Sequence, residues 1–156
     1  MLVTIFAFVS FNLEFMDNQN ALHGTAVLVK PTLINDPDNK KNQVGVIIMA
    51  SVKDDNVMVS FGRNGHSFFP TDALLILRKP EDIRLDAQND FTLLPFYDYA
   101  DIMSIIELAE SSSSAFRKEA VVLAMKSPDV LEYTMVSLST ALGMKRNPGI
   151  SRGYYM

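Results

Sequence analysis

The feature that most constrains the fold is a change in the spacing of apolar residues along the chain. Between Leu22 and Lys79, short apolar runs alternate with turn-forming residues, which is the pattern of a small all-β unit. From Pro95 onward, apolar residues recur every three or four positions, which predicts amphipathic helices. A run of strands followed by a run of helices is typical of the α+β class, and we expect that fold class here.

Five strands are expected in the first part of the chain. Pro31 ends the first strand, because proline cannot donate a hydrogen bond to a ladder, and a long polar loop over residues 31–42 follows it. Gly45 lies where a bulge or a close approach of two backbones would be useful. One helical turn, capped by Thr71 or Asp72, precedes the last strand. The predicted strands are residues 24–30, 43–51, 56–61, a short strand that starts at Ser67, and residues 75–77.

The segment GRNGH, residues 62–66, joins two of these strands. Asn64-Gly65 is a strong hairpin signal, because both residue types tolerate a positive φ. A phosphate-binding loop would need a helix directly after it, and the sequence SFFP of residues 67–70 follows instead. The segment is therefore interpreted as a hairpin tip that reverses the chain, and not as an active-site loop.

The order of these elements is strand, long loop, strand, tight turn, strand, hairpin, short strand, helical turn and last strand. Over about residues 22–79 this order resembles the SH3-like small β-barrel superfold, in architecture and without a family signature. The resemblance implies a closed barrel of five strands. The chain has no tryptophan, and its FYDY segment, residues 96–99, lies beyond the predicted barrel, so the aromatic motif of proline-peptide-binding SH3 domains is missing.

Three helices are expected after Pro95, packed on the barrel because so small a helical unit buries too little surface alone. The serine run 111–114 interrupts the pattern, and a second helix is predicted from about residue 114 to 126. Ser127 and Pro128 begin the third helix as N-cap and first helical residue, and Gly143 ends it. The expected apolar faces are Tyr99, Ile102, Met103, Ile106 and Ala109; Phe116, Ala120, Leu123 and Ala124; and Leu131, Met135, Leu138 and Leu142.

The predicted organisation has five parts. Residues 1–21 are an N-terminal extension, 22–79 the SH3-like barrel, 80–94 a linker, 95–144 the helical unit and 145–156 a flexible tail. Charge supports a boundary near Pro80: residues 1–79 carry seven basic and seven acidic side chains, so the whole net charge of −4 falls beyond them.

The first fifteen residues, MLVTIFAFVSFNLEF, are apolar and nearly uncharged. Their apolar run is far shorter than the roughly 20 residues of a spanning helix, and no signal-peptide pattern of basic and small residues flanks it. Three interpretations stay open: an over-extended reading frame or disordered tail before a true start at Met16, an added strand, and membrane or signal use. We expect no membrane association.

Composition excludes several classes of function. The chain has no cysteine, so disulfides, thiolate zinc sites and cysteine nucleophiles are excluded, and a cytoplasmic location is expected. The net charge of −4 argues against a broad basic surface for nucleic acid.

Residues that carry chemistry are few. His23 and His66 lie far apart in the sequence without a third ligand, so we expect neither a metal site nor a catalytic base. The DPDN segment 36–39 begins like a calcium loop, but Lys40 and Lys41 follow where ligands are needed. Asp54 and Asp55 are turn residues in this interpretation. We expect no catalytic residue, no cofactor and no enzymatic activity.

The sequence favours a non-catalytic interaction module that binds an unknown protein or peptide. Its groove is expected between the loop 31–42, the KDDN turn and the outward-facing member of the Phe68/Phe69 pair; alternation exposes one of the two rings unless the helices cover it. The alternative is a nucleic-acid-binding small barrel that uses the basic tail together with Lys30, Lys40, Lys41, Lys53 and Arg63. The candidate binding residues are Phe68, Phe69, Lys40, Lys41 and Arg63. Homo-oligomerisation is left open.

Overall fold

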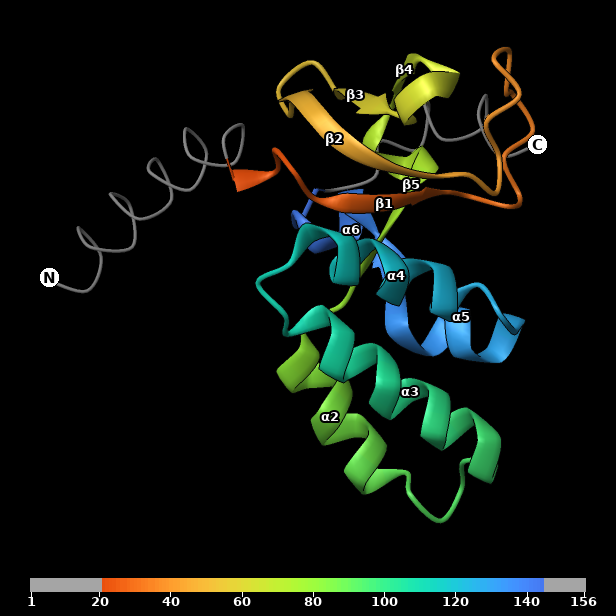
Figure 1. Ribbon diagram of the computed structural model, residues 1–156. Helices are drawn as coiled ribbons and strands as arrows, with labels where there is room; N and C mark the ends of the chain where they lie inside the picture. Colours follow the sequence, from red (N-terminus) through yellow and green to blue (C-terminus); the bar gives the residue numbers. More distant parts are fainter. Residues whose placement is uncertain (1–20, 145–156) are drawn as a thin grey trace, which may run out of the picture.

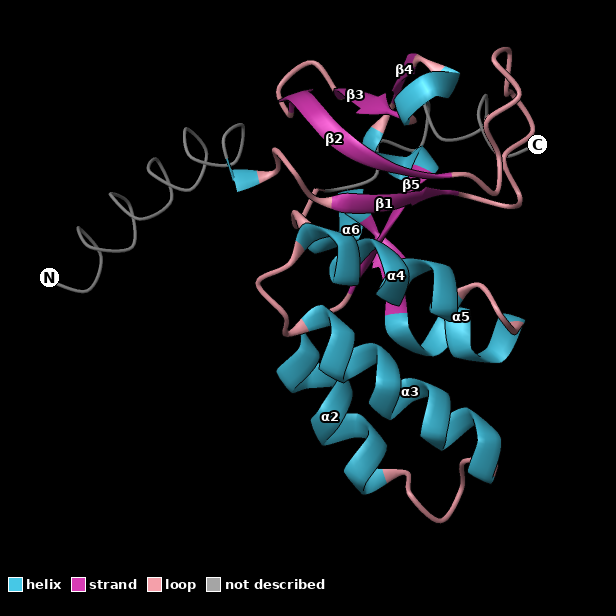
Figure 2. Ribbon diagram, in the orientation of Figure 1, coloured by secondary structure: helices cyan, strands magenta, loops and turns pink. Residues whose placement is uncertain are grey.

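The computed structural model describes residues 21–144. The expectations for the N-terminal extension up to residue 20, including the start at Met16, and for the tail 145–156 lie outside the described residues. The fold is of the predicted α+β class, with an antiparallel sheet and most of the helices on one side of it (Figures 1 and 2).

The sheet has six antiparallel strands in the order β4-β3-β2-β1-β5-β6. The five predicted strands are present within a few residues of their expected bounds, and the helical turn η2, Thr71–Ala73, precedes β5 as expected. A register shift between Ile47 and Met49 bends β2 against β3. The strands are β1 (Ala26–Val29), β2 (Val44–Ser51), β3 (Asn56–Ser60), β4 (His66–Phe69), β5 (Leu74–Leu77) and β6 (Met135–Ser137).

The expectation of a closed five-stranded barrel is wrong, because the sheet is open. β6 comes from the helical part of the chain and pairs antiparallel with β5, with Leu75 opposite Ser137 and Leu77 opposite Met135. It therefore occupies the edge of β5 that a ring of five strands would need for closure. Within residues 21–144, β4 and β6 are the two edges of the sheet.

Two apolar cores lie on opposite sides of β1. Val27 and Val29 point into the sheet core, whereas Leu28 between them points into the helix core, and all three are fully buried. Burial on both faces explains the uninterrupted apolar sequence of β1, since a half-buried strand would alternate. The sheet core contains Ile47, Val57, Val59, Phe61, Phe69 and Leu74, and the helix core contains Ile83, Ile102, Ile105, Ile106, Val121 and Val130.

Five α-helices occur in the described part of the chain, where three were expected. The predicted linker 80–94 is largely helical, because Pro80 begins α2 and Ile83 and Ala87 bury one face of it in the helix core. α4 packs against β1 and β2, and α3 lies against α2, α4 and α5 (Figure 1). The helices are α2 (Pro80–Asn89), α3 (Phe96–Ala109), α4 (Ser114–Ala124), α5 (Pro128–Thr134) and α6 (Leu138–Ala141).

The third predicted helix is broken in the middle. It begins as expected, with the Ser127 hydroxyl accepting a hydrogen bond of 3.1 Å from Val130 N, but it ends at Thr134. The β-branched Thr134 and Val136 favour extended backbone, and β5 offers Met135–Ser137 an open edge to pair with. Ser137 then caps α6, so Leu138 is buried in the sheet core and not on a long helical face.

The apolar faces of the first two helices differ in part from the prediction. Ile102 and Ile106 of α3 are buried as expected, together with Ile105. In α4 the buried residues are Ala120, Val121 and Ala124, but Phe116 is half exposed, because it lies in the first turn beyond the edge of the helix core.

The GRNGH segment is a hairpin tip, as predicted. Phe61 N donates a hydrogen bond of 2.8 Å to Gly65 O and closes the tip. The residues with positive φ are Gly62 and Gly65, and not Asn64, because a short 3₁₀ turn, η1 (Gly62–Asn64), forms the tip. Gly45 serves a close backbone approach: a Cβ there would lie 2.5 Å from Val59 Cγ1 and 2.8 Å from Ser60 O.

Candidate binding groove

A groove of about 430 Å³ lies on the sheet part of the molecule, and none of its lining residues belongs to an α-helix. Its walls come from the loop between β1 and β2, the turn between β2 and β3, and the end of β4 with η2. These are the loop, turn and phenylalanine pair that the sequence predicted as the edges of a groove. The acidic groove, as we call it, is lined by Leu33, Asn35, Asp36, Pro37, Asp38, Asp54, Asp55, Asn56, Phe68, Phe69, Pro70 and Ala73.

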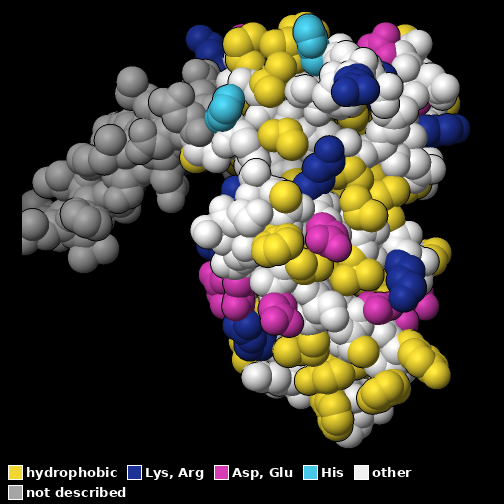
Figure 3. All heavy atoms as spheres, in the orientation of Figure 1, with side chains coloured by type: hydrophobic (Ala, Val, Ile, Leu, Met, Phe, Trp, Pro, Cys, Tyr) yellow, Lys and Arg dark blue, Asp and Glu magenta, His cyan; other side chains and the backbone are white. Residues whose placement is uncertain are grey.

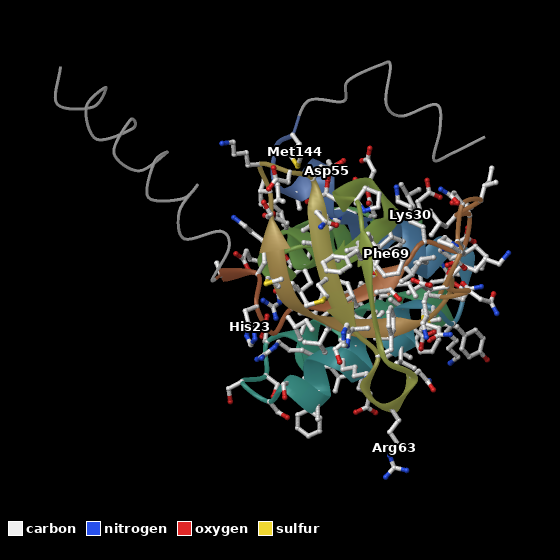
Figure 4. The ribbon with its side chains drawn as sticks, turned by 90° about the horizontal axis from the view of Figure 1, so that it is seen from above. His23, Lys30, Asp55, Arg63, Phe69 and Met144 are labelled. Carbon is white, nitrogen blue, oxygen red and sulfur yellow. The ribbon has the colours of Figure 1, made fainter. Side chains whose placement is uncertain are left out.

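The two phenylalanines of β4 have different roles. Phe69 is 6 % exposed and meets Phe61 edge to face at 6.1 Å between ring centroids, so it belongs to the sheet core (Figure 4). Phe68 is 56 % exposed, because the helices cover other parts of the sheet. It lies opposite Met58 of β3, which lies opposite Met49 of β2, so an outward-facing apolar row leads to the groove. Phe68 is the ring that a ligand could contact.

Side-chain bonds to the backbone fix the two loops of the groove. Asp36 accepts hydrogen bonds of 2.8 Å from the backbone N–H groups of both Lys40 and Lys41, which closes the β1–β2 loop on itself. Asp55, at φ 49°, accepts bonds from Thr71 N at 2.9 Å and from the Thr71 hydroxyl at 2.6 Å, which ties the β2–β3 turn to η2. Loops held in this way present a preformed surface to a ligand.

The electrostatic character of the groove is negative. Four of its lining residues are aspartates and none is basic. Asp38 is exposed, and Asp54 accepts a bond of 2.8 Å from the Ser51 hydroxyl, so both carboxylates keep lone pairs free for another donor. Within residues 21–144, no group of three or more His, Asp or Glu side chains is placed to hold a metal ion. With four aspartates and no basic residue in its lining, the groove has the charge that suits a cationic ligand.

The three basic candidates from the sequence lie outside the groove lining. Lys40 Nζ donates to the Asn64 carbonyl at 2.7 Å and lies 5.1 Å from the Phe61 ring centroid, so it joins the β1–β2 loop to the hairpin tip. Lys41 is exposed on the same loop. Arg63 points into solvent from the tip (Figure 4). The structure brings Phe68 and Phe69 together in the groove lining, to which none of these three side chains contributes.

The four aspartates of the groove are absent from the candidate binding residues of the sequence, although they lie in the loops that the sequence identified. The sequence pattern relates Asp36 and Asp38 to a calcium loop, and Asp54 and Asp55 to a turn or a carboxylate pair. The available signal was the acidic character of the two loops that the sequence already placed at the edges of the groove.

A second hollow, of about 440 Å³, lies where the sheet meets the helices and is lined in part by His23, Arg78, Lys79 and Arg117. Two of its cations have structural partners. Arg78 pairs with Asp86 and donates to the Tyr133 carbonyl at 2.9 Å, and Arg117 donates to the carbonyls of Ser111 and Ser112 at 3.1 and 3.0 Å. The two guanidinium groups are therefore less available to an anionic ligand than the composition of the hollow indicates.

Tyr133, in the helical part, has a pKa above the ordinary tyrosine value. Burial raises the pKa of Tyr133 to about 12, and the hydrogen bond of 2.9 Å that its hydroxyl donates to Asp90 acts in the same direction. The bond ties α5 to the end of α2. His23 and His66 are both exposed, on the chain before β1 and at the start of β4 respectively.

The far end of the helical part is apolar. Figure 3 shows hydrophobic side chains gathered at the lower end of the molecule, over the connection between α2 and α3. We call this surface the helical tip; its residues are Phe91, Leu93, Phe96 and Tyr97, which are 59 to 80 % exposed. No helix among residues 21–144 has the length and hydropathy to cross a bilayer.

Comparison of the chain with family models, with curated proteins and with solved structures found no match.

Proposed function

We propose that the protein is a non-catalytic interaction module that binds an extended, basic peptide segment of a partner protein in the acidic groove. The observation that carries the proposal is the combination of an exposed Phe68 with four aspartates on two fixed loops. A lysine or arginine of the ligand would pair with Asp38 or Asp54, and an apolar or proline residue would pack on Phe68 and Pro70.

The order β4-β3-β2-β1-β5, with a 3₁₀ turn before β5, supports the architectural resemblance of residues 22–79 to SH3-like modules as part of this proposal. Fold analogy alone does not define a function, so the groove is the stronger argument. Nucleic-acid binding through Lys30, Lys40, Lys41, Lys53, Arg63 and the tail stays a prediction. It has weaker support, because an acidic groove repels phosphate.

The test is a binding measurement with immobilised synthetic peptides that combine lysine or arginine with proline or aromatic residues. Phe68→Ala is expected to weaken binding about tenfold or more, as truncation of a central aromatic contact does. Asp38→Asn should weaken it as well, and added salt should reduce the difference.

Phe116→Ala is the matched control, because this phenylalanine is 50 % exposed but lies on α4 in the helical part. Equal binding by the Phe68→Ala and Phe116→Ala variants would contradict the proposal. A shift of single- or double-stranded nucleic-acid probes at low salt that disappears with charge-removing changes at Lys41 and Arg63 would favour the alternative.

A further inference from the structure

We propose that the groove has a ligand within the same chain: residues 145–156, KRNPGISRGYYM, bind in the acidic groove and compete there with peptides from outside. This inference rests on the proposed function, because it identifies an occupant of the same groove. It is carried by three observations, which are the place where the segment leaves the fold, its charge and its length.

The segment begins at the rim of the groove. Met144, the residue before it, has its sulfur 3.5 Å from the Thr71 hydroxyl oxygen, and that hydroxyl donates to Asp55 of the groove lining. Figure 4 shows Met144 and Asp55 side by side at one end of the sheet. The backbone reinforces this placement, since Met144 N donates to Ser139 O at 2.9 Å. These contacts hold Met144 beside Asp55, so the segment that follows it starts next to the groove.

The charges of the two partners are complementary. The segment carries Lys145, Arg146 and Arg152 and no acidic residue, while the groove contributes four aspartates and no basic residue. The segment also contains Pro148 and two tyrosines, which are suited to pack on Phe68. An extended chain with cations and aromatic rings is the kind of ligand that the groove chemistry selects.

The length is sufficient. Twelve residues span up to about 40 Å when extended, which is more than a groove of this size requires. Because the segment is tethered at the rim, its effective concentration at the groove is in the millimolar range, so even a weak interaction is populated. An outside peptide must then displace it, and its apparent affinity falls by the fraction of chains in which the groove is occupied.

The experiment uses the absence of cysteine from the chain. Ser151→Cys introduces one thiol, to which a nitroxide spin label is attached in the full-length chain labelled with ¹⁵N. The amide signals of Asp38, Asp54 and Phe68 are expected to lose most of their intensity, and that of Leu93 at the helical tip is expected to keep it. Reversal of the three charges, by Lys145→Glu, Arg146→Glu and Arg152→Glu, is expected to restore the groove signals.

A conservative variant with Lys145→Arg, Arg146→Lys and Arg152→Lys serves as control and should behave like the parent chain. Groove signals that stay as intense as the signal of Leu93 would overturn the inference. A mixture of spin-labelled and ¹⁵N-labelled chains tests the other occupant: broadening that requires the mixture would place the segment on a second copy and would also overturn it.

The outcomes separate this inference from the proposed function. With the charge-reversed chain, the basic peptides of the preceding test should bind more tightly than with the parent chain, because no tethered competitor remains. If the spin label leaves the groove signals unchanged while added peptides still shift them, the internal ligand is wrong and the proposed function stands. If added peptides shift no groove signal in either chain, both are wrong.

Discussion

The sheet part and the helical part of the molecule hold their surfaces in different ways. In the sheet part, Asp36, Asp55 and Lys40 bond to backbone groups across loops, and these bonds fix the rims of a polar groove. In the helical part, burial of Ile102, Ile105 and their neighbours holds the helices together, and the α2–α3 connection carries large exposed apolar side chains. The comparison teaches that the polar bonds of the sheet part shape loops around a groove, whereas those of the helical part, such as the ion pairs Arg84–Glu110 and Lys126–Asp101, link helices around an apolar core.

The first prediction tests whether the two parts can be separated at all. Leu28→Ala should reduce the free energy of unfolding by about 2–5 kcal/mol, the usual cost of emptying a fully buried leucine site. Because β1 belongs to both cores, hydrogen exchange should show faster exchange at Val59 in the sheet part and at Ile105 in the helical part. Leu85→Ala is the control, since Leu85 is 57 % exposed on α2. Faster exchange in one part alone would mean that the parts unfold independently.

The second prediction perturbs the sheet part alone. Gly45→Ala should cost about 1–3 kcal/mol in urea unfolding, because the added Cβ collides with Val59 and with the backbone of Ser60. Gly62→Ala has open space around it but a φ of 65°, so it should cost about 1 kcal/mol from backbone strain. Amide shifts for Gly45→Ala should spread over β2 and β3 and spare α3. If Gly62→Ala lowered the free energy of unfolding more than Gly45→Ala does, the close backbone approach would not be the reason for a glycine at position 45.

The third and smallest prediction perturbs the helical part alone. Tyr133→Phe removes the bond to Asp90 and should cost about 1 kcal/mol near neutral pH. The folded-state pKa of about 12 lies above the ordinary tyrosine value of 10.0, so the stability that this hydroxyl contributes is complete below pH 10 and is lost as the pH rises through 12.

The difference in stability between parent chain and variant should therefore shrink between pH 10 and 12 in urea titrations. Tyr97→Phe removes a phenol that is exposed at the helical tip and serves as control. A constant difference across this range would show that Tyr133 is not held neutral by its surroundings.

Much of the sheet could be predicted from the sequence because its signals are local. Pro31, the Asn64-Gly65 pair and the alternation of Val57, Val59 and Phe61 each act within a few residues. β6 could not be predicted in this way, because Met135–Ser137 becomes a strand only through pairing with β5, which lies about sixty residues earlier in the chain. The same reason explains why the predicted third helix is interrupted. Its leucine spacing is helical, but Met135–Ser137 in its middle forms β6.

The candidate groove was predictable in its location and less so in its charge. Period-two alternation identified Phe68 and Phe69 as an inward and outward pair, and loop positions identified the rims. The local pattern could not show that Lys40 bonds across to the hairpin tip, which removes it from the groove lining. Polar contacts between residues far apart in the sequence decide which charged side chains face a ligand, and the local sequence pattern does not reveal those contacts.

The double burial of β1 has a consequence for how this chain can be handled and rearranged. Cutting the chain after Lys79 would expose Leu28, Val44 and Leu75 together on one face of the sheet, and β5 would lose its pairing with β6. An exposed apolar face next to an unpaired strand edge favours aggregation. The sheet is therefore not an independent folding unit. A fragment or fusion that includes the sheet must also include the helices that cover it and β6.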